Sequence, residues 1–119
     1  MSFDLFVWHE GAPISADEAG SKLDRWTDGE SDVFRPHPAV SMFRDAILTR
    51  FPPPENHGAD SVWSVTPAPS DSIAALSCTW SRADEVSDAV LELAAEHGLV
   101  CYDPGSHVVT PDGAGSVAR

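Results

Sequence analysis

The sequence predicts an α+β protein folded as one domain, and three observations support this class. A chain of 119 residues, of which 42% are hydrophobic, is long enough to bury a single core. Apolar residues recur at helical spacing in several segments, and short aromatic and β-branched runs between them are typical of strands. We expect the domain to span residues 1–110. Residues 111–119 are expected to form a flexible tail, because they offer little to bury.

The first strand and the first helix each carry a clear local signal. Residues 3–8, FDLFVW, hold one charge among apolar side chains, which is typical of a buried central strand. Ser15 and Glu18 form a capping box, in which each side chain satisfies a backbone N–H of the first helical turn. The pair Asp28 and Gly29 then ends this helix.

A second helix is expected to begin at Pro38, since the N–H that proline lacks would be unpaired at that position. The helix must end before the prolines that open residues 52–60, which are predicted to form an exposed loop. Residues 30–36 are expected to be a polar connection. Two strands are predicted at residues 61–65 and 73–80. The core side of the longer strand is predicted to carry Ala74, Leu76, Cys78 and Trp80.

The third helix has the clearest apolar stripe in the chain. Ser81 is predicted to cap it, with Asp84 at the reciprocal position of a capping box, and Gly98 to end it in the left-handed conformation. The side chains expected to face the core are Val86, Ala89, Val90, Leu93 and Ala94.

The last elements complete a recognisable order. Residues 99–102 are predicted to form a strand, residues 103–106 a Pro-Gly turn, and residues 107–110 a short edge strand. The resulting βαββαβ order predicts a ferredoxin-like sandwich, with helices on one face of an antiparallel sheet and an extra helix after the first strand. The first strand then separates Cys78 from Cys101 by two strand spacings, about 9–10 Å. A disulfide cannot reach that far, so free thiols are predicted.

The composition excludes some classes of partner. The 19 acidic residues outnumber the 7 basic ones and give a net charge of −12, whereas binding to nucleic acid needs a basic surface. No run is long and apolar enough to span a membrane, and the N-terminus lacks the features of a signal peptide, so a cytoplasmic protein is expected. The chain has no nucleotide-binding glycine motif and no His spacing typical of a metal site, so no cofactor and no metal are predicted.

One segment gathers side chains of the types used in covalent catalysis. Residues 98–109, GLVCYDPGSHVV, include Cys101, Asp103, Ser106 and His107. A turn explains them better than a catalytic centre does, because nucleophile and base normally come from separate elements, and no catalytic residue is predicted. The alternative is a small enzyme, or a ligand-binding or metal-binding domain, that uses the sheet face or a cleft where His9, Asp103 and His107 converge.

A row of acidic residues lies along the third helix. Asp84, Asp88, Glu92 and Glu96 are successive i, i+4 neighbours, and Glu85 lies beside them. Like charges at this spacing destabilise a helix, so helix stability alone does not favour the row. We therefore expect a docking face for a basic protein partner. The alternative is a solvated face of an acidic protein. The chain also holds four tryptophans, and one exposed beside this row would resemble an interface anchor.

The segments FDLFVW (residues 3–8) and EHGLVCYDP (residues 96–104) together resemble a family of small, acidic, uncharacterised bacterial proteins, mainly actinobacterial. Members have a YDLYVW-like first strand and a GLVCYDPQ-like segment, and this chain has Gly105 in place of the glutamine. The resemblance covers both ends of the chain. It implies a non-enzymatic immunity protein that binds a secreted toxin domain and blocks it. A homodimer through an exposed sheet face is compatible with either function.

Overall fold

The computed structural model describes residues 2–10, 14–30, 33–51, 63–65, 71–105 and 108–110. The strands in these segments are β1 (Ser2–Trp8), β2 (Trp63–Val65), β3 (Ala74–Thr79), β4 (Val100–Asp103) and β5 (Val108–Thr110). The helices are α1 (Ala16–Thr27), α2 (Pro38–Arg50) and α4 (Ala83–Glu96), with a 3-10 turn, η2 (Trp80–Arg82), directly before α4. The predicted α+β class is confirmed. The predicted loop at 52–60 and the predicted tail at 111–119 lie outside the described residues.

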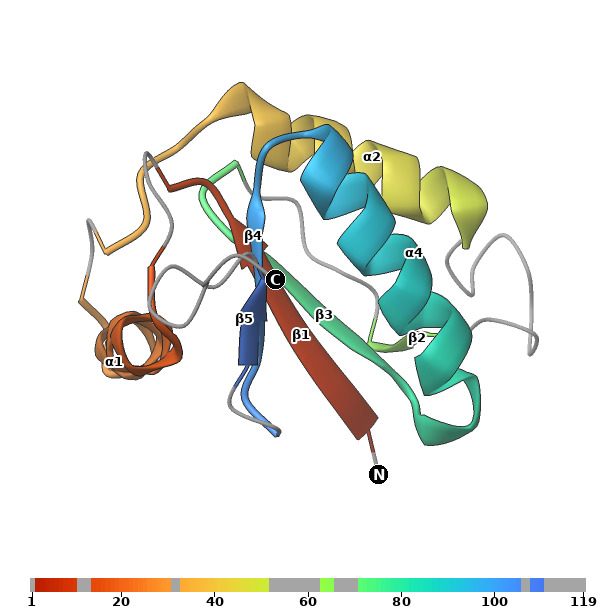
Figure 1. The fold of residues 1–119 in the computed structure, drawn as a ribbon, viewed down its shortest axis with the longest axis horizontal. Helices are drawn as coiled ribbons and strands as arrows, with labels where there is room; N and C mark the ends of the chain where they lie inside the picture. The colour runs from red at the N-terminus through yellow and green to blue at the C-terminus, as the bar shows by residue number, and fades with distance from the viewer. Residues whose placement is uncertain are drawn as a thin grey trace, which may run out of the picture.

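Strand β1 is the centre of an antiparallel sheet with the order β2-β3-β1-β4-β5 (Figure 1). It pairs with β3 along one edge, with Phe3 opposite Cys78, and with β4 along the other, with Val7 opposite Cys101. Strand β1 therefore lies between β3 and β4. The two cysteines are separated by β1, and both are free and buried as predicted.

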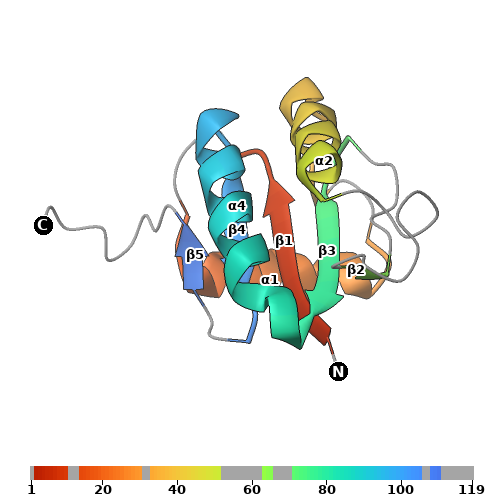
Figure 2. The ribbon, with the colours of Figure 1, turned by 90° about the vertical axis from the view of Figure 1, so that its right-hand side faces the viewer.

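The helices lie on both faces of the sheet, so the expectation of helices on one face holds for α2 and α4 but not for α1. Helices α2 and α4 pack side by side on one face, whereas α1 lies on the other (Figures 1 and 2). The reason lies in β1, because strand side chains alternate between faces and β1 is apolar on both. Leu5 and Val7 point towards α2 and α4, while Phe6 and Trp8 belong to the cluster under α1.

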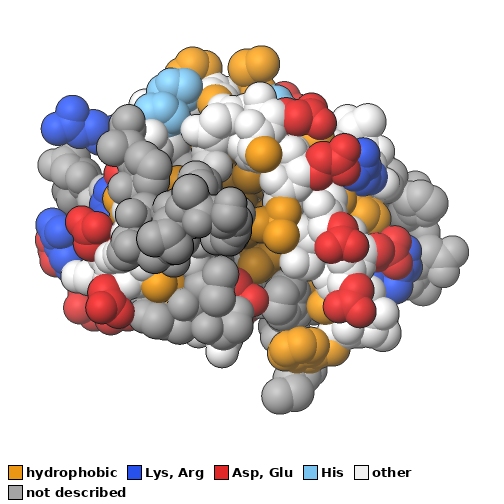
Figure 3. All heavy atoms as spheres, in the orientation of Figure 1, with side chains coloured by type: hydrophobic (Ala, Val, Ile, Leu, Met, Phe, Trp, Pro, Cys, Tyr) orange, Lys and Arg blue, Asp and Glu red, His pale blue; other side chains and the backbone are white. Residues whose placement is uncertain are grey.

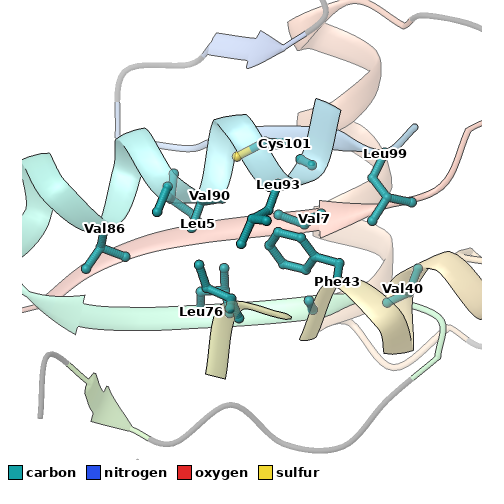
Figure 4. Close-up of a cluster of buried hydrophobic side chains, with 14 of the residues drawn as sticks. Leu5, Val7, Val40, Phe43, Leu76, Val86, Val90, Leu93, Leu99 and Cys101 are labelled. Carbon is teal, nitrogen blue, oxygen red and sulfur yellow. The ribbon is translucent and has the colours of Figure 1, made fainter. Parts of the chain in front are cut away.

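The larger apolar cluster fills the space between the sheet and the helices α2 and α4 (Figure 4). Phe43 and Ile47 of α2 are fully buried there, as is Val90 of α4. The predicted stripe of α4 is buried throughout, as helical spacing of its apolar residues requires. These two helices and the sheet form the main core of the protein.

The smaller cluster lies on the opposite face, beneath α1. Trp8 is fully buried, and its ring centroid lies 4.7 Å from that of Phe34. Val33 and Phe34 are both buried, so the expectation of a polar connection over residues 30–36 was wrong. Both side chains belong to the same cluster as Leu23 of α1. Towards the start of β1 this same face carries a polar pair, in which Ser77 Oγ donates to Asp4 Oδ1 at 2.6 Å.

Most helix ends follow the local signals in the sequence. Ser15 caps α1 in a reciprocal capping box with Glu18, and Gly98 takes a positive φ of 69° after α4. The predicted cap of α4 was wrong, because η2 precedes the helix and its N-cap is Arg82, without a side-chain cap bond. Trp80 belongs to this turn and not to the strand, so it is 53% exposed where a core position was expected. No described helix meets the length and hydropathy required to cross a membrane.

Replacing Leu23 with Ala tests whether the α1 layer is part of the cooperative fold. The side chain is buried over the second cluster, and its truncation is expected to lower the free energy of unfolding by roughly 2–3 kcal/mol. Urea unfolding followed by tryptophan fluorescence measures this change. The matched control is Ser21→Ala on the exposed side of the same helix, expected to change stability by less than about 0.5 kcal/mol. Equal stability of the two variants would show that α1 is not docked on the sheet.

Candidate functional site

The acidic row predicted on the third helix lies on the solvent side of α4. Its apolar stripe faces the sheet, so the 3.6-residue period turns the acidic residues outward. All five predicted residues are exposed: Asp84, Glu85, Asp88, Glu92 and Glu96. Acidic side chains gather over α4 in the space-filling view (Figure 3). We call these five residues the acidic face.

Two arginines neutralise part of the acidic face. Arg82 donates to both carboxylate oxygens of Glu85, and this hydrogen bond is the main reason that the pKa of Glu85 lies below its usual value. Arg50 at the end of α2 lies 3.5 Å from Glu92. Within the described part of the chain no ion pair is formed by Asp84, Asp88 or Glu96. The acidic face therefore retains a net negative charge.

Exposed apolar side chains accompany these carboxylates. Trp80, in the turn that leads into α4, is 53% exposed, and Leu91 of α4 is 37% exposed. Leu91 lies three residues after Asp88 and is therefore its neighbour on the helix surface. Trp80 is therefore an exposed tryptophan of the kind that we expected to mark an interface beside the acidic row. The surface of α4 thus combines negative charge with apolar area.

The alternative site does not assemble from the residues that the structure describes. Asp103 Oδ1 accepts the N–H of Gly105 at 2.9 Å, so it serves its own turn as the sequence predicts. His9 follows β1, and the pairing of Trp8 with Val100 places it near the start of β4, whereas Asp103 ends that strand. About four residues, roughly 13 Å of strand, separate the two positions. His107 and Ser106 lie outside the described residues.

His9 instead stacks on His37, a contact that the sequence did not predict. The ring centroids are 3.8 Å apart and the planes differ by 7°. His37 caps α2, because its Nδ1 accepts the N–H of Ala39 at 3.1 Å. The lone pairs of parallel rings lie in parallel planes, so the two side chains cannot point at one metal ion. No group of three or more potential metal ligands occurs among the described residues.

The two thiols are held in their protonated form. Burial is the main cause that raises the pKa of Cys78 to about 11, and the carboxylate of Asp4 adds to it. Burial and the carboxylate of Asp103 raise the pKa of Cys101 to about 12. A nucleophilic cysteine needs a stabilised thiolate, which a cationic neighbour or a helix N-terminus provides. The surroundings of both cysteines have the opposite effect.

An open hollow between α1 and the end of β4 was missed by the sequence reasoning. It measures about 410 Å³ and is lined by Asp17, Gly20, Ser21, Leu23, Asp24, Tyr102 and Pro104. The signal that could have found its helical wall is the spacing of Asp17, Gly20, Ser21 and Asp24, which is the i, i+3, i+4, i+7 pattern of one helix face. Nothing in the sequence indicated that Tyr102 would lie opposite this face.

Comparison of this chain with protein-family models, with curated proteins and with solved structures finds no match.

The raised thiol pKa values predict slow labelling of the native protein. At pH 8, 5,5′-dithiobis(2-nitrobenzoate) should react roughly 100-fold more slowly with the folded chain than with the urea-unfolded chain, since a pKa near 11 leaves far less thiolate. Because folding favours the protonated form, the free energy of unfolding should also fall as pH rises from about 9 towards 11. Cys101→Ala isolates the reaction of Cys78. Rapid labelling of the folded chain at pH 8 would contradict the buried environment.

Asp88→Lys tests whether the acidic face weakens the helix. The change replaces two repulsive i, i+4 pairs with two attractive ones, so the free energy of unfolding should rise by about 0.5–1 kcal/mol at low salt. Urea unfolding at low salt, about 20 mM NaCl, and at high salt, about 1 M NaCl, separates the charge contribution from helix propensity, because only the former is screened. Asp88→Gln is the control that removes repulsion without adding attraction. A lysine variant less stable than wild type at low salt would contradict the prediction.

Proposed function

We propose that this chain is a non-enzymatic protein-binding module that docks a basic partner through the acidic face of α4. The single observation that carries the proposal is the exposed Trp80 next to the carboxylates of the acidic face, with Leu91 among them. Carboxylates alone would be compatible with a merely solvated helix. Exposed apolar area beside charge supports an interface, because tryptophan is among the residues that most often anchor protein contacts.

Charge and apolar area would play different parts in such a complex. Exposed ion pairs contribute only about 0–1 kcal/mol each, whereas a buried tryptophan anchor contributes roughly 2 kcal/mol or more. Trp80 would therefore account for much of the lifetime of the complex. The acidic face would mainly accelerate encounter with a positively charged surface and select partners by charge.

The more specific form of the proposal is a cytoplasmic immunity protein. Its support is the resemblance of FDLFVW and EHGLVCYDP to the family described above, together with an acidic surface suited to covering a basic toxin domain. We also propose that the fold is a ferredoxin-like sandwich. Strands β2, β3, β1 and β4 with helices α2 and α4 are compatible with a ferredoxin-like sandwich to which α1 and β5 are added.

For the immunity form, the binding probe is a toxin domain if one is encoded beside this gene. Surface plasmon resonance at low salt should give a saturable complex, and co-expression should relieve the growth arrest that the toxin domain causes. Asp88→Lys with Glu92→Lys should lower the association rate constant roughly tenfold. Trp80→Ala should raise Kd by about tenfold or more, mainly through faster dissociation.

Asp28→Lys with Glu30→Lys is the matched control, because it makes the same change in net charge next to α1, on the other side of the sheet. Equal weakening by both double variants would reduce the effect to overall charge and contradict docking at α4. A genomic neighbourhood without a toxin gene would contradict the immunity form. The basic-partner form would then be tested with the protein that wild type captures and the α4 double variant does not.

A further inference from the structure

The open hollow between α1 and the end of β4 has walls of two kinds. Helix α1 contributes Asp17 and Asp24, two turns apart, and between them the small residues Gly20 and Ser21. The far wall consists of Tyr102 and Pro104, where β4 runs into its turn. With a volume of about 410 Å³, the hollow lies within the usual range for sites that bind small molecules.

The small residues on α1 are what keep the space open. A side chain at position 20 or 21 reaches the same region as Asp17 and Asp24, since residues three and four apart share a helix face. Glycine is a poor helix former in the middle of a helix, and Gly20 is the fifth of the twelve residues of α1. The stability of α1 alone would favour a larger residue at this position.

The electrostatic environment of the hollow is negative. After burial, the carboxylates of Asp24, Asp103 and Asp17 are the causes that raise the pKa of Tyr102, so their fields converge on its hydroxyl. Tyr102 is 4% exposed and is part of the cluster beneath α1. The tyrosine is therefore a rigid wall with a neutral hydroxyl in a field that favours cations.

The cations of α1 are engaged at other carboxylates. Lys22 pairs with Glu10, which also accepts the indole N–H of Trp8. Arg25 pairs with Glu30 beyond the end of the helix. Neither basic side chain is among the described residues that line the hollow, which offer carboxylates, a phenol and apolar surface.

We propose that this hollow binds the ammonium or guanidinium end of a flexible cationic chain. The carboxylates of Asp17 and Asp24 would hold the charged group, while Leu23, Tyr102 and Pro104 would contact its methylene stem. Lysine and arginine side chains have this combination of apolar stem and charged tip, as do free alkylamines. An inorganic cation would not use the apolar wall, and the described residues include no group of three or more potential metal ligands.

The hollow is separate from the acidic face of α4, because α1 and α4 lie on opposite faces of the sheet (Figure 2). This site does not depend on the proposed function. A partner could reach it only from the α1 side, so a cationic probe that binds here leaves the amides of α4 undisturbed.

The test is an NMR titration of the full chain with capped arginine and capped lysine, Nα-acetylated amides that imitate side chains of a protein. The amides of Gly20 and Ser21 and the resonances of Tyr102 should shift saturably. Capped citrulline, which has nearly the same shape without the charge, should shift them far less. Agmatine is the arm for a free amine: tighter binding of agmatine than of capped arginine assigns the site to small amines, and the reverse assigns it to a protein side chain.

Two variants separate the hollow from general attraction to an acidic protein. Asp24→Asn should weaken binding roughly five- to tenfold by removing one charged acceptor, while Asp28→Asn, one turn further on and not part of the hollow, should leave it unchanged. Gly20→Leu should fill the space and abolish the shifts while the chain stays folded. Equal binding of capped citrulline, unchanged affinity in Gly20→Leu, or shifts that appear mainly on α4 would overturn the proposal.

Discussion

The fold depends on a central strand that is apolar on both faces. Strand β1 is paired along both edges, so its backbone is satisfied within the sheet, and its side chains then need cover on two sides. Helices α2 and α4 cover Leu5 and Val7, and α1 together with Val33 and Phe34 covers Trp8. A chain of 119 residues is thereby divided into two apolar clusters of unequal size.

The parts that were predicted correctly from sequence are those that a few neighbouring residues determine. The capping box of Ser15, the helix start at Pro38 and the left-handed Gly98 each depend on local backbone chemistry. The side of the sheet that α1 would choose depends on residues far apart in sequence, and no local pattern specifies it. The exposed position of Trp80 was missed because side chains no longer alternate between the faces of the sheet where a 3-10 turn replaces the strand.

The same distinction applies to the candidate sites. Helical periodicity alone places the acidic face of α4 in solvent, so its residues could be identified without a structure. The turn role of Asp103 was likewise local. The hollow beside α1 could not be predicted, because its far wall includes Tyr102, which lies on a strand about eighty residues further along the chain.

Charge alone does not distinguish the two surfaces, since both are acidic and either would attract a cation. Their shapes do. The acidic face is an exposed helix surface with Trp80 at its start and Leu91 within it, which suits broad contact with a folded partner. The hollow has a rigid aromatic wall and space for one side chain, which suits recognition of a single charged group. Because the sheet separates them, a partner that does not wrap around the protein engages only one of the two at a time.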